Sequence, residues 1–183
     1  MSLIAYANGI LLADRVAGTE LSQTQKLDMP KLHVHEKNAF ALAYCGRQIY
    51  DDELQKLMTS FFIITSLNCV GKDKVLDLFG FFEKCYLEDR VYLLMTRDRI
   101  FMSYGSQGFI MTEQKEPVVE GTLGDAFVVA VTAGLTPLKA AKEATLLAYG
   151  HESQIDYVQQ SSLKRISAAK RKELERVMRE EGL

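Results

Sequence analysis

The chain opens with the stretch SLIAYANGILLAD, residues 2–14. Its apolar residues form two short runs, Ser2 to Tyr6 and Gly9 to Ala13, with Asn8-Gly9 at the junction. An Asn-Gly pair that joins two apolar runs is a strong signal for a two-residue hairpin turn. The stretch therefore predicts a β-hairpin whose first strand starts at Ser2 and whose second strand ends at Asp14.

Ser2 directly follows Met1, at the start of the first predicted strand. Removal of Met1 would leave one residue that carries both a hydroxyl and a free α-amine. The hydroxyl can attack a carbonyl carbon, and the amine, with an ordinary pKa of about 8, can take its proton. Serine is common behind an initiator methionine, so Ser2 alone does not identify a catalytic site.

The composition is ordinary for a soluble globular protein. The 183 residues are 48% hydrophobic and 25% charged, and a chain of this length fits one domain. The net charge of −2 gives no argument for binding nucleic acid or an anionic membrane. The sequence shows no signal peptide and no apolar run near the roughly 20 residues of a membrane span. We therefore expect a cytoplasmic protein without nucleic-acid or membrane partners.

The cysteines and histidines give little support for a metal or a cofactor. Cys45, Cys69 and Cys85 are odd in number, widely spaced and free of a CxxC motif, which argues against disulfides and a zinc site. His33 and His35 alternate along a predicted strand and could share a metal on one face. Without a third ligand nearby, a solvated strand face is the favoured interpretation. We expect no cofactor and no metal.

Most of the remaining chain shows clear strand or helix patterns. Further strands are predicted over 31–35, 39–44, 91–95, 100–103, 109–111, 118–119 and 155–158. Apolar spacings of three and four, or helix start and stop residues, predict helices over 54–62, 75–85, 126–133, 136–149 and 163–179. The polar segment from Gly18 to Asp28 lacks periodicity and predicts a loop.

The order of these elements predicts an α+β fold. Four strands, two helices, further strands, two helices, a strand and a helix suit two packed antiparallel sheets with helix pairs outside them, a four-layer αββα sandwich. No internal repeat or linker divides the chain. We expect one domain over residues 1–160 and a charged helical extension over 161–183.

Several short motifs follow one another along the chain. Asp14 ends the second strand, and Lys31 stands seventeen residues later at the start of another strand. The other motifs are Ala43-Tyr44-Cys45-Gly46, the helix-opening pair Asp51-Asp52, and Gly121-Thr122-Leu123-Gly124. With these motifs the chain resembles proteasome-type N-terminal-nucleophile hydrolases, from Ser2 to Val158. The resemblance is to 20S proteasome β-subunits and to the bacterial ATP-dependent peptidase built like them.

The resemblance implies a role for each matching residue. Ser2 would be the nucleophile, and the cation of Lys31 would help to keep the Ser2 amine neutral and basic. Asp14 would pair with Lys31, and the backbone N–H of Gly46 would face the oxyanion. The remaining expected site residues are Tyr44, which would line the substrate pocket, and Thr122 and Ser153, whose hydroxyls would support the amine.

Each residue also has a purely structural interpretation, and the sequence departs from the family pattern. Asp14 and Gly46 can simply end strands, Lys31 can be a solvated strand residue, and Thr122 can be a helix N-cap. The usual nucleophile is threonine, a supporting aspartate is missing near Gly150, Leu123 replaces a glycine, and the first hairpin is short.

The family resemblance implies an endopeptidase subunit that cleaves polypeptides within a homo-oligomeric ring, with an ATPase unfoldase as a partner. That activity requires removal of Met1. Two alternatives remain open at this stage. The chain could be a non-catalytic relative that keeps the fold as a structural subunit, or an N-terminal-nucleophile amidase that acts on a small amide.

Overall fold

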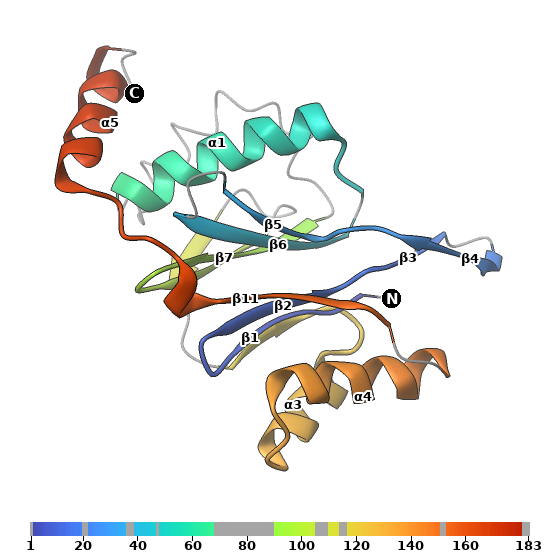
Figure 1. Cartoon of the computed structure of the whole chain (residues 1–183). Helices are drawn as coiled ribbons and strands as arrows, with labels where there is room; N and C mark the ends of the chain where they lie inside the picture. The colour runs from blue at the N-terminus through green and yellow to red at the C-terminus, as the bar shows by residue number, and fades with distance from the viewer. Residues whose placement is uncertain are drawn as a thin grey trace.

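A computed structural model describes residues 2–19, 22–35, 39–46, 48–67, 90–104, 110–113, 117–150 and 153–180. Two antiparallel sheets stack face to face at the centre of the molecule (Figure 1). Helix α1 (Asp51–Leu67) covers one sheet, and helices α3 (Gly124–Thr132) and α4 (Pro137–Tyr149) cover the other. The predicted α+β sandwich of helix and sheet layers is confirmed. The helix predicted over 75–85 lies outside the described residues.

The first sheet contains the hairpin that the opening stretch predicted. Its strand order is β10-β1-β2-β11, and every pairing is antiparallel. Asn8 and Gly9 turn the chain with φ of 50° and 73°, as a two-residue primed turn requires. The strands are β1 (Ile4–Ala7), β2 (Ile10–Asp14), β10 (Val118–Glu120) and β11 (Ile155–Gln159).

The second sheet has five antiparallel strands in the order β5-β6-β7-β8-β9. It confirms the predicted pairing of the strands near 31–35 and 39–44 and the hairpin about Arg97-Asp98. The strands are β5 (Leu32–Val34), β6 (Phe40–Gly46), β7 (Arg90–Thr96), β8 (Ile100–Tyr104) and β9 (Ile110–Glu113).

The loop predicted over Gly18 to Asp28 was wrong. Strands β3 (Val16–Thr19) and β4 (Ser22–Asp28) pair as a two-stranded antiparallel ribbon. A ribbon of this kind is joined by backbone hydrogen bonds, and its mainly polar sequence gives no apolar alternation to detect. The ribbon projects from one end of the sandwich beside the N-terminus (Figure 1).

Alternation along the strands divides the interior into layers, as a period of two requires. In β6, Phe40, Leu42 and Tyr44 belong to the cluster packed beneath α1. Ala41, Ala43 and Cys45 belong to the cluster between the two sheets, which also includes Ile4 and Tyr6 of β1. Side chains on the opposite face of β1 pack against α3 and α4. They are Ala5 and Ala7, together with Leu3 just before the strand.

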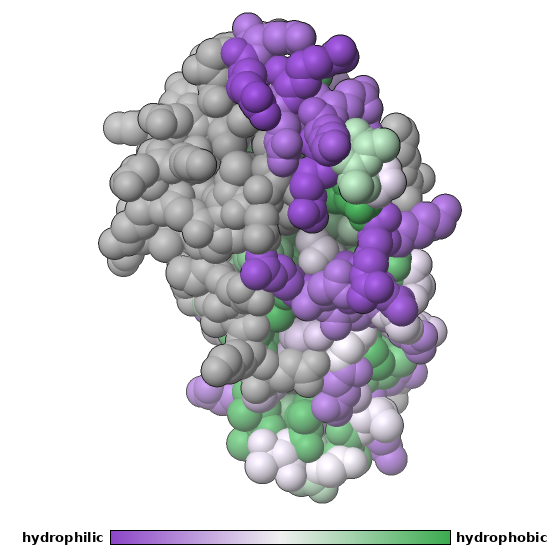
Figure 2. Space-filling model, turned by 90° about the vertical axis from the view of Figure 1, so that its left-hand side faces the viewer, coloured by the Kyte–Doolittle hydropathy of each residue, from purple (hydrophilic) through white to green (hydrophobic). Residues whose placement is uncertain are grey.

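The helix predicted over 163–179 begins later. Leu163 is buried between the sheets in an irregular segment, and α5 runs from Ala168 to Glu180. Ile166 and Leu174 pack against the cluster beneath α1, so tertiary packing of the connecting segment delays the helix start. Figure 2 shows hydrophilic residues gathered at the top of the molecule, where α5 lies. Within the described residues, no helix is both long and apolar enough to cross a membrane.

Candidate active site

The start of β1 and the end of β2 meet at one edge of the first sheet. Ile4 pairs with Ala13, and the backbone N–H of Asp14 donates to the Leu3 carbonyl at 3.0 Å. Ser2, which is half-buried, therefore lies beside Asp14. The hairpin alone brings these two residues together, because its turn fixes the register of both strands.

Lys31 reaches this edge from the second sheet, just before β5. Its Nζ donates to Ser2 Oγ at 2.9 Å, to Asp14 Oδ1 at 2.8 Å and to the Val16 carbonyl at 2.6 Å. These three acceptors match the three hydrogens of an ammonium group. Lys31 is 6% exposed and Asp14 is fully buried. Such a buried ion pair is well satisfied only because each charge has further hydrogen-bond partners.

Asp14 accepts hydrogen bonds on both carboxylate oxygens. Besides Lys31, the backbone N–H of Leu3 donates to Oδ1 at 3.0 Å. The phenol of Tyr149, at the end of α4, donates to Oδ2 at 3.4 Å. Sequence reasoning missed Tyr149, because its position before the helix-ending Gly150 indicated only a helix terminus. Burial, and then the neighbouring Asp14 carboxylate, raise the pKa of the Tyr149 phenol.

The turn before α3 holds the backbone of Ser2. The Ser2 N–H donates to Thr122 Oγ1 at 3.2 Å, and the Leu123 N–H points at the Ser2 carbonyl at 3.5 Å. Gly121 has a φ of 100°, and a Cβ there would lie 2.1 Å from the Ser2 oxygen, so only glycine fits. Leu123 is itself the N-cap position of α3 and packs beneath α3 and α4, which explains an apolar residue in this turn.

Tyr44 and Gly46 lie near the end of β6, next to Lys31. The Tyr44 N–H donates to the Lys31 carbonyl at 3.0 Å, and Gly46 ends the strand with a φ of 113°. The Tyr44 side chain is 3% exposed and stacks on His33, with ring centroids 6.0 Å apart. Burial raises the pKa of the Tyr44 phenol.

Ser153 is not among the described hydrogen-bond partners of Ser2. Its N–H donates to Thr145 Oγ1 and its Oγ donates to the Gln154 carbonyl, both at 3.2 Å. The Gln154 carbonyl in turn accepts the Arg15 N–H at 3.2 Å. Ser153 therefore fixes the segment after α4 beside the end of β2, without a described contact to the Ser2 amide.

Cys45 lies between the sheets within electrostatic reach of Lys31 and Asp14. Burial chiefly, with help from the Glu120 charge, raises the pKa of its thiol to about 11, while Lys31 acts in the opposite direction. The thiol is consequently protonated at neutral pH and is a poor nucleophile. Ser2 is therefore the better nucleophile candidate at this edge.

His33 and His35 do not form a solvated strand face. His33 stacks on Tyr44 and His35 stacks on Phe40, and both are partly buried beneath α1. Burial lowers the pKa of His33. The two histidines border a hollow of about 360 Å³; the other residues lining it are Leu32, Val34, Leu54, Gln55, Met58 and Thr59. Across the described ranges, no cluster of three His, Cys, Asp or Glu residues could hold a metal ion.

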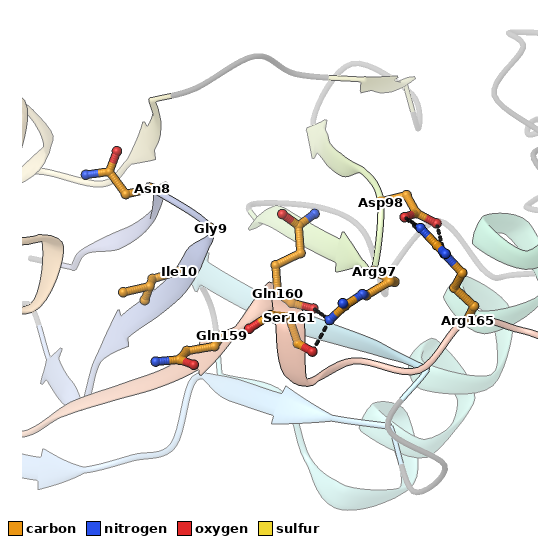
Figure 3. A pocket seen from close by; sticks show the side chains of 9 residues that line it. All are labelled: Asn8, Gly9, Ile10, Arg97, Asp98, Gln159, Gln160, Ser161 and Arg165. Carbon is orange, nitrogen blue, oxygen red and sulfur yellow. Dashed lines mark hydrogen bonds and ion pairs between the residues drawn. The ribbon is translucent and has the colours of Figure 1, made fainter.

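A larger polar hollow of about 560 Å³ lies at the Asn8-Gly9 turn, the opposite end of β1 from Ser2 (Figure 3). Its two arginines already have partners. Arg97 donates to the Gln160 and Ser161 carbonyls, and Arg165 forms a two-pronged pair with Asp98. Because the Arg165 pair is largely exposed, it contributes little to stability. The buried network around Ser2 is the stronger candidate for chemistry.

Two stacked antiparallel sheets lie between helix layers, the arrangement expected of the proteasome-type N-terminal-nucleophile hydrolase fold, and the buried Lys31–Asp14 pair lies beside Ser2. Comparison with solved structures confirms this fold. Eukaryotic HslV from Trypanosoma brucei superposes with a TM-score of 0.57 at 14% identity, over 86% of this chain and 98% of that one.

Thiobacillus denitrificans BPH is also similar. Its complex with epoxomicin gives a TM-score of 0.52 at 12% identity, over 87% of this chain and 98% of that one. The same protein described without that ligand gives a TM-score of 0.50 at 12% identity, with the same coverage. No protein-family model and no curated protein sequence matches the chain. At such low identities the likeness establishes the fold.

Proposed function

We propose that the chain is a proteasome-like endopeptidase subunit whose nucleophile is Ser2 after removal of Met1. The observation that carries this proposal is the position of Lys31 Nζ, 2.9 Å from Ser2 Oγ and 2.8 Å from Asp14 Oδ1. A cation buried against a hydroxyl at the start of a chain suits acyl transfer from an N-terminal residue.

In the proposed mechanism, Ser2 Oγ attacks the peptide carbonyl carbon and the free α-amine takes the hydroxyl proton. The Lys31 ammonium favours a neutral amine through like-charge repulsion and stabilises negative charge on Oγ. The leaving amine of the substrate takes the proton as the peptide C–N bond breaks, which leaves an ester on Ser2. Water then cleaves the ester by the same route and restores the hydroxyl.

Gly46, Thr122 and Tyr44 have supporting roles in this proposal. The Gly46 N–H donates to the oxyanion, a contribution on the order of 10²–10³ in rate. Thr122 Oγ1 lies 3.2 Å from the Ser2 nitrogen and orients the amine. Tyr44, whose ring stacks on His33, lines the pocket that takes the side chain preceding the scissile bond. We assign Ser153 to fixing the segment at Gln154, instead of to a direct contact with the Ser2 amine.

We further propose that the subunit works as a homo-oligomeric ring in the cytoplasm and receives unfolded polypeptide from an ATPase unfoldase. The outer helix layer supports self-association, since Val129 is 69% exposed and Leu147 is 78% exposed. Figure 2 also shows apolar residues at the bottom of the molecule, where α3 and α4 lie in Figure 1. A monomer by multi-angle light scattering would contradict the ring.

Intact-mass measurement with covalent labelling tests the activity. A chain without Met1 that gains the mass of one epoxomicin molecule on Ser2 is expected, because a peptide epoxyketone reacts with both the hydroxyl and the amine of an N-terminal nucleophile. Ser2→Ala is the matched control and is not labelled. Retention of Met1 in the native protein supports the non-catalytic alternative. Labelling by a small oligomer without turnover of long peptides supports the amidase alternative.

A further inference from the structure

The end of α4 reaches the candidate active site through a single described side chain. The Tyr149 phenol donates to Asp14 Oδ2 at 3.4 Å, whereas Oδ1 accepts from Leu3 N–H and Lys31 Nζ. The contact is long for a hydrogen bond between oxygens. Tyr149 nevertheless donates the described hydrogen bond to Oδ2 of Asp14, a carboxylate with no exposed surface.

The position of Tyr149 is set by packing outside the site. Its ring packs against the cluster beneath α3 and α4, where Ala140, Ala141 and Ala144 are buried. Gly150 ends α4 immediately afterwards with a φ of 72°. The phenol is therefore positioned by packing of the helix that carries it.

The protonation state of Tyr149 suits a permanent donor. Burial and the Asp14 carboxylate both raise the pKa of the phenol above its usual value of 10.0. The hydroxyl therefore keeps its proton throughout the pH range in which a peptidase works. In contrast, Ser153, the residue that the sequence pattern offered for support after α4, makes its described contacts with Thr145 and Gln154.

We infer that Tyr149 is a positioning residue of this site, which supports the nucleophile indirectly by orienting the Asp14 carboxylate against Lys31. The chain of contacts runs from the Tyr149 hydroxyl through both Asp14 oxygens to Lys31 Nζ and Ser2 Oγ. This indirect support through Asp14 differs from support by a hydroxyl that contacts the Ser2 amine. The inference about catalysis rests on the proposed function, and the inference about geometry can be tested without it.

The variant Tyr149→Phe removes the hydroxyl and keeps the ring in its cluster. Exchange of the Lys31 ammonium hydrogens with water is measured in ¹H–¹⁵N spectra of the full chain, and burial together with three acceptors is expected to make this exchange slow. We expect several-fold faster exchange in Tyr149→Phe. We also expect kcat for a fluorogenic peptide to fall about tenfold with KM unchanged, the effect of losing one hydrogen bond to a charged group.

Tyr6→Phe is the matched control, because it removes a phenol contact of 2.6 Å to Gln160 at the far end of β1. It is expected to leave Lys31 exchange and kcat unchanged, even where it lowers the melting temperature. A fluorinated tyrosine at position 149 keeps ring and hydroxyl and is expected to restore slow exchange. If Tyr149→Phe fails to fold, the fluorinated tyrosine decides the case, because its more acidic hydroxyl is a stronger donor: Lys31 exchange faster than in the unaltered chain overturns the inference.

Unchanged Lys31 exchange in Tyr149→Phe overturns the inference, whatever the activity. Faster exchange in Tyr149→Phe, with no epoxomicin labelling or turnover in the unaltered chain, upholds the geometry and rejects the proposed function. Faster exchange with wild-type kcat restricts Tyr149 to a structural role and refutes its support of the nucleophile. The two proposals can therefore fail separately.

Discussion

The substitution Lys31→Met tests the buried pair on which the site depends. Methionine keeps most of the apolar stem and removes the charge that lies 2.8 Å from Asp14 Oδ1. The side chains of Lys31 and Asp14 are 8% and 0% exposed, so solvent screens the pair little. Leaving the Asp14 carboxylate buried without its cation is expected to cost about 3–5 kcal/mol of the free energy of unfolding.

The assay is urea unfolding at pH 7 and one fixed protein concentration, because self-association changes apparent stability. The double variant Lys31→Met/Asp14→Asn removes both charges of the pair, and the amide that replaces the Asp14 carboxylate can still accept the Leu3 N–H. We expect it to lose less stability than the sum of the single variants, with a coupling of at least about 2 kcal/mol. All three variants are expected to lose peptide turnover.

Lys170→Met is the matched control for Lys31→Met. Lys170 pairs with Glu173 at 2.9 Å, but the two side chains are 34% and 51% exposed. An exposed pair of this kind contributes about 0–1 kcal/mol, so little stability is lost. A cost for Lys31→Met within about 1 kcal/mol of this control refutes the buried-pair reasoning. Wild-type turnover in Lys31→Met refutes the mechanism.

Three further substitutions test the turn that holds Ser2 and the burial of the Cys45 thiol. Gly121→Ala is expected to abolish turnover and epoxomicin labelling, because its Cβ would lie 2.1 Å from the Ser2 carbonyl oxygen. Gly134→Ala is the control, since Gly134 has a similar φ of 93° but open space around the added Cβ. It is expected to cost only about 1 kcal/mol of the free energy of unfolding and to keep activity. Equal activity in both alanine variants would show that Ser2 is not held by this turn. Cys45 has a thiol pKa raised from 9.0 to about 11, so the folded chain holds a proton that the unfolded chain releases, and stability falls as pH rises from 9 to 11. Urea unfolding across this range is expected to show a shallower fall in Cys45→Ala, and an equal slope contradicts the thiol burial.

Much of the fold could be predicted from local sequence. Asn8-Gly9 sets the β1–β2 hairpin, Thr136-Pro137 and Gly150 bound α4, and Asp51 opens α1. Each of these signals is local, because a turn conformation or a helix end depends on a few neighbouring residues. Thr136 occupies the N-cap position of α4 with an extended backbone, but its side chain makes no cap hydrogen bond.

The errors occurred where longer-range contacts decide the conformation. The β3–β4 ribbon is stabilised by pairing between two polar segments, which leaves no periodic signal. The late start of α5 follows from burial of Leu163 between the sheets. His33 and His35 stack on Tyr44 and Phe40 because β5 lies next to β6 under α1. None of these contacts follows from the local sequence.

The sequence by itself determined most of the strands and helices, their layered arrangement, and the residue types that could support Ser2 as a nucleophile. Only the tertiary structure decided which side chains meet. It brings Lys31 of one sheet to Ser2 and Asp14 of the other, adds Tyr149 from α4, and leaves Ser153 outside the described contacts of Ser2. The physical reason is that strand and helix patterns are set by neighbouring residues. A buried charge network instead depends on distances between segments far apart in sequence, which only the packed layers fix.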